Sequence, residues 1–174
     1  MSDARVQPDG LHRDFGDESG ASVSLCSLRA GPGLFGIDTR KIREVLGATT
    51  PQRVPLSPQY ISGVVPYRGE VLTTVCFRVL LGLERWSKQR CVLILDDEDE
   101  GPFGLAMESV GEVVTIAQDA LEPNPSVLDP RSMALFDGTY RLPAGLMVRL
   151  DPHRLHPSRL AETGLFADLK LEMI

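Results

Sequence analysis

The sequence predicts an all-β fold in which many short strands form a barrel or a sandwich. Short apolar runs recur at close spacing along most of the chain, and turn signals rich in Gly, Pro and Asp separate them. The chain has 174 residues, of which 43% are hydrophobic, so it can bury a real core as one compact domain or as two intimately packed halves.

The N-terminal segment, residues 1–20, is polar, contains Gly and has no apolar periodicity. We expect it to be disordered, because such a composition cannot offset the entropy lost on ordering. From Ala21 the pattern changes to two apolar runs, ASVSLCSLRA and LFGI, which are separated by Gly31-Pro32-Gly33. This turn chemistry predicts a hairpin of two strands.

The next segment, IDTRKIREVLG, has the spacing of a short helix. Asp38 can cap its first turn and Gly47 can end it. Ile42, Val45 and Leu46 would share one helical face. The pattern therefore predicts one or two turns of helix.

A connector and a second hairpin follow. Pro51, Pro55 and Pro58 hold the connector extended, and it leads into GVVPYRGEVLTTVCF, where two apolar runs are joined through Tyr67-Arg68-Gly69-Glu70. The pattern predicts a hairpin with Arg68 at its bend. A guanidinium is costly to bury alone, so Arg68 either lies in solvent or faces something outside this chain.

The second half of the chain has the same pattern of short apolar runs separated by turns. Its strand candidates are CVLIL, FGLAM, VGEVVTI, MALF, TYRL and LMVRL, and Asp137-Gly138 reads as a turn between two of them. The C-terminal region combines helix-forming residues with Pro157 as a breaker. It predicts a short helix and then a partly apolar tail.

The composition excludes several classes of function. The net charge is −6, the pI is about 5.1, and the 18 Lys and Arg residues are scattered, so nucleic acid is not an expected partner. No stretch approaches the roughly 18 uninterrupted apolar residues of a membrane span. Cys26, Cys76 and Cys91 lie far apart inside apolar runs, as is typical of buried thiols in a reducing compartment. We therefore expect a cytoplasmic protein that does not insert into a membrane.

Candidate catalytic and metal sites are weak. A nucleophile at Cys76 or Cys91 needs a base, and the only histidines outside the N-terminal segment are His153 and His156. These histidines, with Asp151 nearby, lack the further ligands of a metal site, so a solvated helix face is favoured. The run DDEDEGPFGLAME fits neither register of a calcium-binding loop and predicts an acidic turn between two buried strands.

Four segments together resemble the CheW family of chemotaxis coupling proteins: FGIDTRKIREVLG, VPLSPQYISGVVPYRGEVLTTVCFRVLLG, FGLAMESVGEVVTI and LMVRLDPHRL. The resemblance covers about residues 22–160 and depends on the order and spacing of the segments rather than on a single motif. It implies two packed five-stranded SH3-like barrels with short helices. We accordingly expect one domain over residues 21–161 and a C-terminal tail, with helix-forming residues, over residues 162–174.

The resemblance also implies a function. It implies a non-catalytic adaptor without cofactor or metal, recruited to receptor clusters, that couples the cytoplasmic tips of chemoreceptors to the regulatory domain of a CheA-type histidine kinase. Carried onto this sequence, the kinase-binding residues are Thr39, Lys41, Ile42 and Glu44, and the receptor-binding residues are Gly63, Val64 and Arg68. An exposed Ile42 beside a carboxylate suits a small apolar interface with a charged rim.

Two alternatives remain open. The chain departs from the family pattern at Thr39, Pro66-Tyr67 and Cys76-Phe77. These departures suit a divergent accessory module that keeps only one of the two interfaces and serves a motility or other chemosensory pathway. A less favoured alternative is an enzyme that uses a cysteine and a C-terminal histidine.

Overall fold

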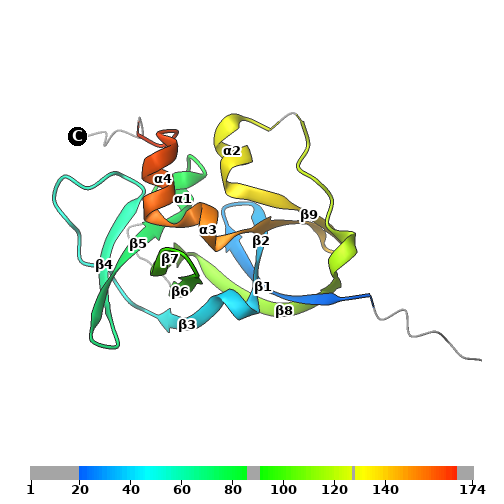
Figure 1. The fold of residues 1–174 in the computed structure, drawn as a ribbon, viewed down its shortest axis with the longest axis horizontal. Helices are drawn as coiled ribbons and strands as arrows, with labels where there is room; N and C mark the ends of the chain where they lie inside the picture. Colours follow the sequence, from blue (N-terminus) through cyan, green and yellow to red (C-terminus); the bar gives the residue numbers. More distant parts are fainter. Residues whose placement is uncertain (1–19, 86–90, 127, 168–174) are drawn as a thin grey trace, which may run out of the picture.

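The computed structural model describes residues 20–85, 91–126 and 128–167 of the chain (Figure 1). Within them, ten strands form two five-stranded sheets, and the helices are few and short. The predicted all-β fold with two five-stranded units is therefore confirmed. The predicted disorder at the N-terminus concerns residues 1–20, of which residues 1–19 lie outside the described residues.

The first sheet has the strand order β8-β1-β2-β10-β9. Its strands are β1 (Ser22–Ala30), β2 (Gly33–Asp38), β8 (Ser109–Ala117), β9 (Phe136–Leu142) and β10 (Gly145–Leu150). β1 and β2 form the hairpin predicted around Gly31-Pro32-Gly33, with Ala30 opposite Gly33. β10 runs parallel to β2 and joins the β9–β10 hairpin to it.

The second sheet has the order β3-β6-β7-β5-β4. Its strands are β3 (Ile42–Gly47), β4 (Ile61–Tyr67), β5 (Glu70–Cys76), β6 (Cys91–Asp97) and β7 (Gly101–Met107). β4 and β5 form the second predicted hairpin, and β6 and β7 are joined by the predicted acidic turn. Because β5 runs parallel to β7, both sheets have the same arrangement of two hairpins joined by a parallel pair.

The strands of the first sheet come from both ends of the chain, and those of the second sheet from its middle. Along the chain, β3 follows the β1–β2 hairpin and β8 follows the β6–β7 hairpin. However, β3 pairs with β6 in the second sheet, and β8 pairs with β1 in the first sheet. The second sheet is therefore built from the consecutive strands β3 to β7, whereas the first sheet combines β1 and β2 with β8, β9 and β10 (Figure 1).

An isolated bridge links the two edges of each sheet. Gln52, in the chain that leaves edge strand β3, pairs with Val64 of edge strand β4. Glu122, in the chain that leaves edge strand β8, pairs with Thr139 of edge strand β9 in the same way. These bridges close the sheets into barrels, since each connects the first edge to the last.

A glycine with positive φ stands next to each bridge. Gly63 has φ +142° and Gly138 has φ +144°. A Cβ on Gly63 would lie 2.6 Å from the carbonyl carbon of Gln52, and one on Gly138 would lie 2.7 Å from the carbonyl oxygen of Glu122. Only glycine allows this backbone conformation together with so close an approach.

The short helices lie beside and between the sheets. They are the 3-10 turns η1 (Thr39–Lys41) and η2 (Gln118–Ala120) and the α-helices α1 (Phe77–Leu80), α2 (Pro130–Leu135), α3 (Pro152–Leu155) and α4 (Pro157–Thr163). Figure 1 shows α3 and α4 over the region where the two sheets meet. None of the helices in the described part of the chain has the length and apolar character that crossing a bilayer requires.

One large core joins both sheets and the helices. It contains Phe35 of the first sheet, Phe103 of the second sheet and Phe77 of α1, all nearly inaccessible to solvent. Phe166, beyond α4, is 1% exposed and packs edge-on against Tyr60. Burying side chains of this size contributes roughly 1.5–3 kcal/mol each, so the two barrels are held together as one body.

Three local predictions were wrong. The segment Ile42–Gly47 is strand β3 rather than helix, and only the 3-10 turn that Asp38 caps is helical. The apolar spacing fitted a short helix, but pairing with β6 outweighs so weak a helical preference. The run MALF, predicted as a strand, ends helix α2, whose start is fixed by the Asp129 cap and by Pro130.

The third concerns Asp137-Gly138, which was predicted as a turn and lies inside β9. A glycine is required here because the backbone of Glu122 approaches closely, and the chain does not change direction at this position.

Candidate functional site

The tip of the β4–β5 hairpin presents Arg68 to solvent. Arg68 and Gly69 have φ +47° and +80°, which is the two-residue turn that matches the twist of a hairpin. The Arg68 side chain is 75% exposed, and its guanidinium lies 5.2 Å from the ring centroid of Tyr67. Its Nη2 is 3.7 Å from Oε2 of Glu44 on β3. Arg68 therefore contacts Tyr67 and Glu44 and leaves most of its surface available to another molecule.

The predicted kinase-binding residues lie where η1 passes into β3. Asp38 caps η1 by accepting a hydrogen bond from the Arg40 N–H at 2.9 Å. Thr39 and Lys41 are partly exposed, and Lys41 Nζ is 3.0 Å from Glu98 Oε1. That hydrogen bond raises the pKa of Lys41.

Ile42 and Glu44 differ in exposure. Ile42 is half-buried and packs partly against the core, whereas Glu44 is exposed. A partner at this surface would therefore reach the Glu44 carboxylate and only part of the Ile42 side chain.

The predicted receptor-binding residues are placed differently from one another. Gly63 is buried against the backbone of Gln52, Val64 is half-buried, and Arg68 is exposed. Among the seven predicted site residues, the structure brings Glu44 and Arg68 into contact. The predicted kinase surface and the predicted receptor surface thus meet at one ion pair.

Two exposed apolar residues near these positions were missed. Val45, assigned to the buried face of a predicted helix, is 45% exposed on β3, and Val71 is 69% exposed on β5. The alternation of a strand, once β3 is assigned correctly, is the signal that identifies Val45. Exposed apolar side chains beside charged ones are typical of the core of a protein interface.

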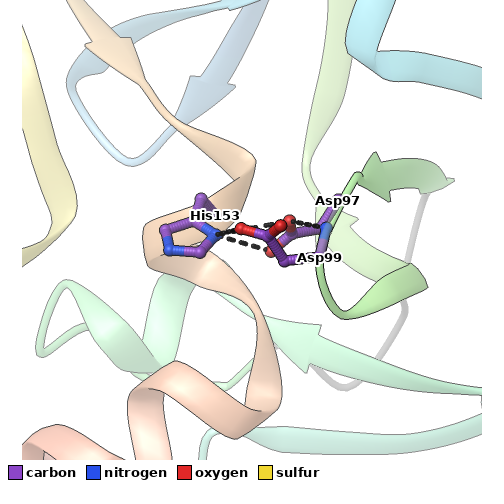
Figure 2. Close-up of side chains that lie close together, drawn as sticks. All are labelled: Asp97, Asp99 and His153. Carbon is purple, nitrogen blue, oxygen red and sulfur yellow. Dashed lines mark hydrogen bonds and ion pairs between the residues drawn. The ribbon is translucent and has the colours of Figure 1, made fainter.

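Asp97, Asp99 and His153 form the densest cluster of metal-ligating groups among the described residues, with ligand atoms within 4.8 Å of one another. Figure 2 shows His153 on α3 facing Asp97 and Asp99 at the β6–β7 turn. His153 Nδ1 is 3.0 Å from Asp97 Oδ2, and the Asp99 N–H donates to Asp97 Oδ1 at 3.0 Å.

The internal pairing accounts for this cluster. Burial raises the pKa of Asp97, but the hydrogen bond from the Asp99 N–H and the pairing with His153 outweigh it, so this pKa lies below its usual value. The cluster ties α3 to the second sheet, and we assign no metal to it.

His156 is not on a solvated helix face, contrary to the prediction. It is 8% exposed, its ring lies 5.0 Å from that of Phe103, and its Nδ1 accepts a hydrogen bond from the Ser158 N–H at 3.1 Å. It caps α4 because Pro157 begins a new helix instead of only ending one. Burial lowers the pKa of His156.

All three thiols are buried, as predicted. Burial raises the pKa of Cys26 and that of Cys91, and Cys91 Sγ lies 3.5 Å from the carbonyl oxygen of Met107. A raised pKa disfavours the reactive thiolate. For these two thiols the geometry gives no support to nucleophilic catalysis.

The comparisons with known proteins agree with this architecture. A CheW-like domain model matches residues 24–159. The chain is 24% identical over 141 residues to the chemotaxis protein CheW of Rhizobium meliloti, which covers 80% of this chain and 91% of that protein. It is 21% identical over 145 residues to the chemotaxis protein CheW of Treponema pallidum, covering 78% and 82% respectively.

A solved structure shares the fold. The crystal structure of the scaffolding protein TtCheW from Thermoanaerobacter tengcongensis superposes with a TM-score of 0.67 at 21% identity, over 75% of this chain and 90% of that one. At this identity the likeness shows the fold, while the domain model, which spans most of the chain, shows the family. With its two five-stranded sheets and this match, the chain belongs to the CheW-like domain family.

Proposed function

We propose that this chain is a chemosensory adaptor that couples the cytoplasmic tip of a chemoreceptor to the regulatory domain of a CheA-type histidine kinase. Kinase binding is assigned to Thr39, Lys41, Ile42 and Glu44, and receptor binding to the hairpin that carries Gly63, Val64 and Arg68. The adaptor would act in the cytoplasm at receptor clusters.

The family gives the coarser part of this function. Members of the CheW-like family are non-catalytic scaffold or adaptor proteins of chemotaxis, and this chain is accordingly an adaptor and not an enzyme. The alternative of a cysteine-dependent enzyme is therefore set aside. The identity of the two partners is the part that we add as a proposal.

The contact between Glu44 and Arg68 is the observation that most strongly supports coupling. Each residue belongs to a different predicted surface, and their side chains lie 3.7 Å apart. A kinase that binds Glu44 would alter the ion pair with Arg68 and so change the affinity of Arg68 for a receptor. By thermodynamic linkage, receptor binding at Arg68 would change the affinity for the kinase by the same factor. The individual contacts are expected to be modest in affinity and to be strengthened by multivalent assembly.

Binding of the purified kinase regulatory domain tests the first interface. Ile42→Asp and Glu44→Lys are expected to weaken binding by about tenfold or more, because each places a wrong charge or an unpaired group at the interface. Circular dichroism and urea unfolding of the variants should be close to wild type for Glu44→Lys, since exposed ion pairs contribute roughly 0–1 kcal/mol.

The first sheet offers a matched control. Arg141 and Glu122 form an ion pair whose side chains are 74% and 45% exposed, compared with 75% and 43% for Arg68 and Glu44. Glu122→Lys changes the net charge equally but lies outside the predicted surface, so kinase binding should be retained. Equal losses in Glu44→Lys and Glu122→Lys would show a general charge effect and contradict the proposed surface.

Binding of a receptor cytoplasmic fragment tests the second interface. Arg68→Glu is expected to weaken it, while Arg141→Glu leaves it unchanged. Binding to the kinase or to the receptor, but not to both, would instead support the divergent module with a single interface. Failure to bind either partner would contradict the adaptor role.

A further inference from the structure

A cavity of about 380 Å³ opens on the second barrel. It is lined by the chain that leaves β3, by β4, by the end of β5 with α1, and by the end of β7. The volume lies within the range of roughly 300–1,000 Å³ that is usual for small-molecule sites. It corresponds to about a dozen water molecules at roughly 30 Å³ each.

The walls of the cavity carry more positive than negative charge. Three guanidinium groups line it, those of Arg53, Arg78 and Arg85, and Glu108 is the carboxylate among its described lining residues. This is the reverse of the whole chain, which has a net charge of −6.

Arg78 and Glu108 neutralise each other. Their ion pair is largely desolvated, with 17% and 12% of the side chains exposed, and Arg78 Nε also donates to the carbonyl oxygen of Glu84 at 2.8 Å. The one carboxylate of the cavity wall is therefore already engaged and does not balance the other two arginines.

Arg85 is held in place by neutral groups. Its Nη2 donates to the carbonyl oxygens of Gln59 and Ile61, the second at 3.1 Å. Burial lowers the pKa of Arg85; the nearby Cys76 thiol opposes this shift and the positive charge of Arg53 adds to it. No carboxylate of the described residues acts on the pKa of Arg85, so its partly desolvated guanidinium faces a second cation without a balancing anion.

We propose that this cavity binds a small organic acid, with a carboxylate of the ligand between Arg53 and Arg85 and its carbon skeleton against Pro51 and Met107. Guanidinium groups match the geometry of a carboxylate and form two parallel hydrogen bonds with it. The apolar part of the lining excludes water and strengthens this pairing. The cavity adjoins the proposed receptor-binding hairpin, because Ser62 of β4 lines it, but none of the seven residues assigned to the kinase and the receptor is among its lining residues, so the site does not depend on the adaptor role.

Calorimetric titration of the full chain with succinate and with citrate tests the site, with neutral succinamide at matched ionic strength as the control ligand. At least one of the two acids should bind at millimolar or lower concentration, and succinamide should not. Arg85→Gln should weaken binding by about tenfold or more, the effect of losing a charged hydrogen-bond partner. Arg141→Gln, at an exposed arginine outside the cavity, should leave it unchanged.

Two further variants decide the matter if Arg85→Gln does not fold. Arg53→Gln alters an exposed residue and should weaken binding by several-fold with the fold intact. Arg53→Glu places a carboxylate at the same exposed position, so it should abolish binding of the acid. Absence of binding by both acids, equal binding of succinamide, or unchanged binding in Arg53→Gln and Arg53→Glu would overturn the proposal.

Discussion

Replacing Gly63 with alanine tests how the second barrel is closed. The φ of +142° is unfavourable for an L-residue, and forcing alanine into it costs of order 1–3 kcal/mol. A Cβ would also press on the backbone of Gln52 and displace the two Gln52–Val64 hydrogen bonds, both 2.8 Å long. Each bond contributes about 1 kcal/mol, so we expect Gly63→Ala to lower the free energy of unfolding by about 3–5 kcal/mol.

Urea unfolding followed by circular dichroism measures this loss. With a typical slope of about 1–3 kcal/mol per molar urea, the midpoint should fall by roughly 1–5 M. Gly47→Ala is the matched control, since Gly47 has no positive φ and no atom within 4 Å of its Cβ position, and it should stay within about 1 kcal/mol of wild type.

A clear outcome would refute the reasoning. If Gly63→Ala unfolds within about 1 kcal/mol of wild type, the close approach of Gln52 does not constrain this position. If that stable variant also fails to bind the receptor fragment, Gly63 acts at the partner surface and not in closing the barrel.

Three further predictions concern buried groups. Burial lowers the pKa of His156, so the unfolded chain binds a proton first as the pH falls below about 6.5. Wild type should therefore lose stability between about pH 7.5 and pH 5.5, measured as a falling urea midpoint. His156→Asn, which keeps a capping side chain, should lose less stability over the same pH range. Phe166→Ala should cost about 3–5 kcal/mol in thermal or urea unfolding, and an effect below about 1 kcal/mol would mean that the segment after α4 does not pack in the core. Cys26 and Cys91 should react slowly with Ellman's reagent in native protein and fast in urea, and equal rates would contradict their burial.

The hairpins could be predicted from the sequence because their signals are local. The turn at Arg68-Gly69 and the apolar runs on either side fix the β4–β5 register without help from the rest of the chain. The resemblance to a family then supplied the number of sheets, which apolar patterning alone left open between a barrel and a sandwich.

The wrong predictions concern segments whose secondary structure is determined by tertiary pairing. Ile42, Val45 and Leu46 fit one helical face and also fit a strand, and the choice depends on β6, which lies more than forty residues away. Gly138 resembles a turn residue until Glu122 is placed beside it. Local spacing does not carry information of this kind.

The candidate sites depend even more than the secondary structure on contacts between residues that are far apart in the sequence. The contact of Glu44 with Arg68 joins edge strand β3 to the turn that follows edge strand β4. The charged cavity brings Arg53 together with Arg78 and Arg85, which come from a stretch 25 or more residues further along the chain. Each arginine, considered alone, is typical of a surface position, so the cavity could not be predicted from the sequence.

The pairing of β3 with β6 and of β8 with β1 has a consequence for how the chain can be divided. A break between β5 and β6 would give two fragments, each holding a strand whose hydrogen-bonding partner is in the other fragment. Neither fragment should fold alone, but the two should complement each other when mixed. By the same geometry, two intact chains can trade halves and form a swapped dimer without any new interface.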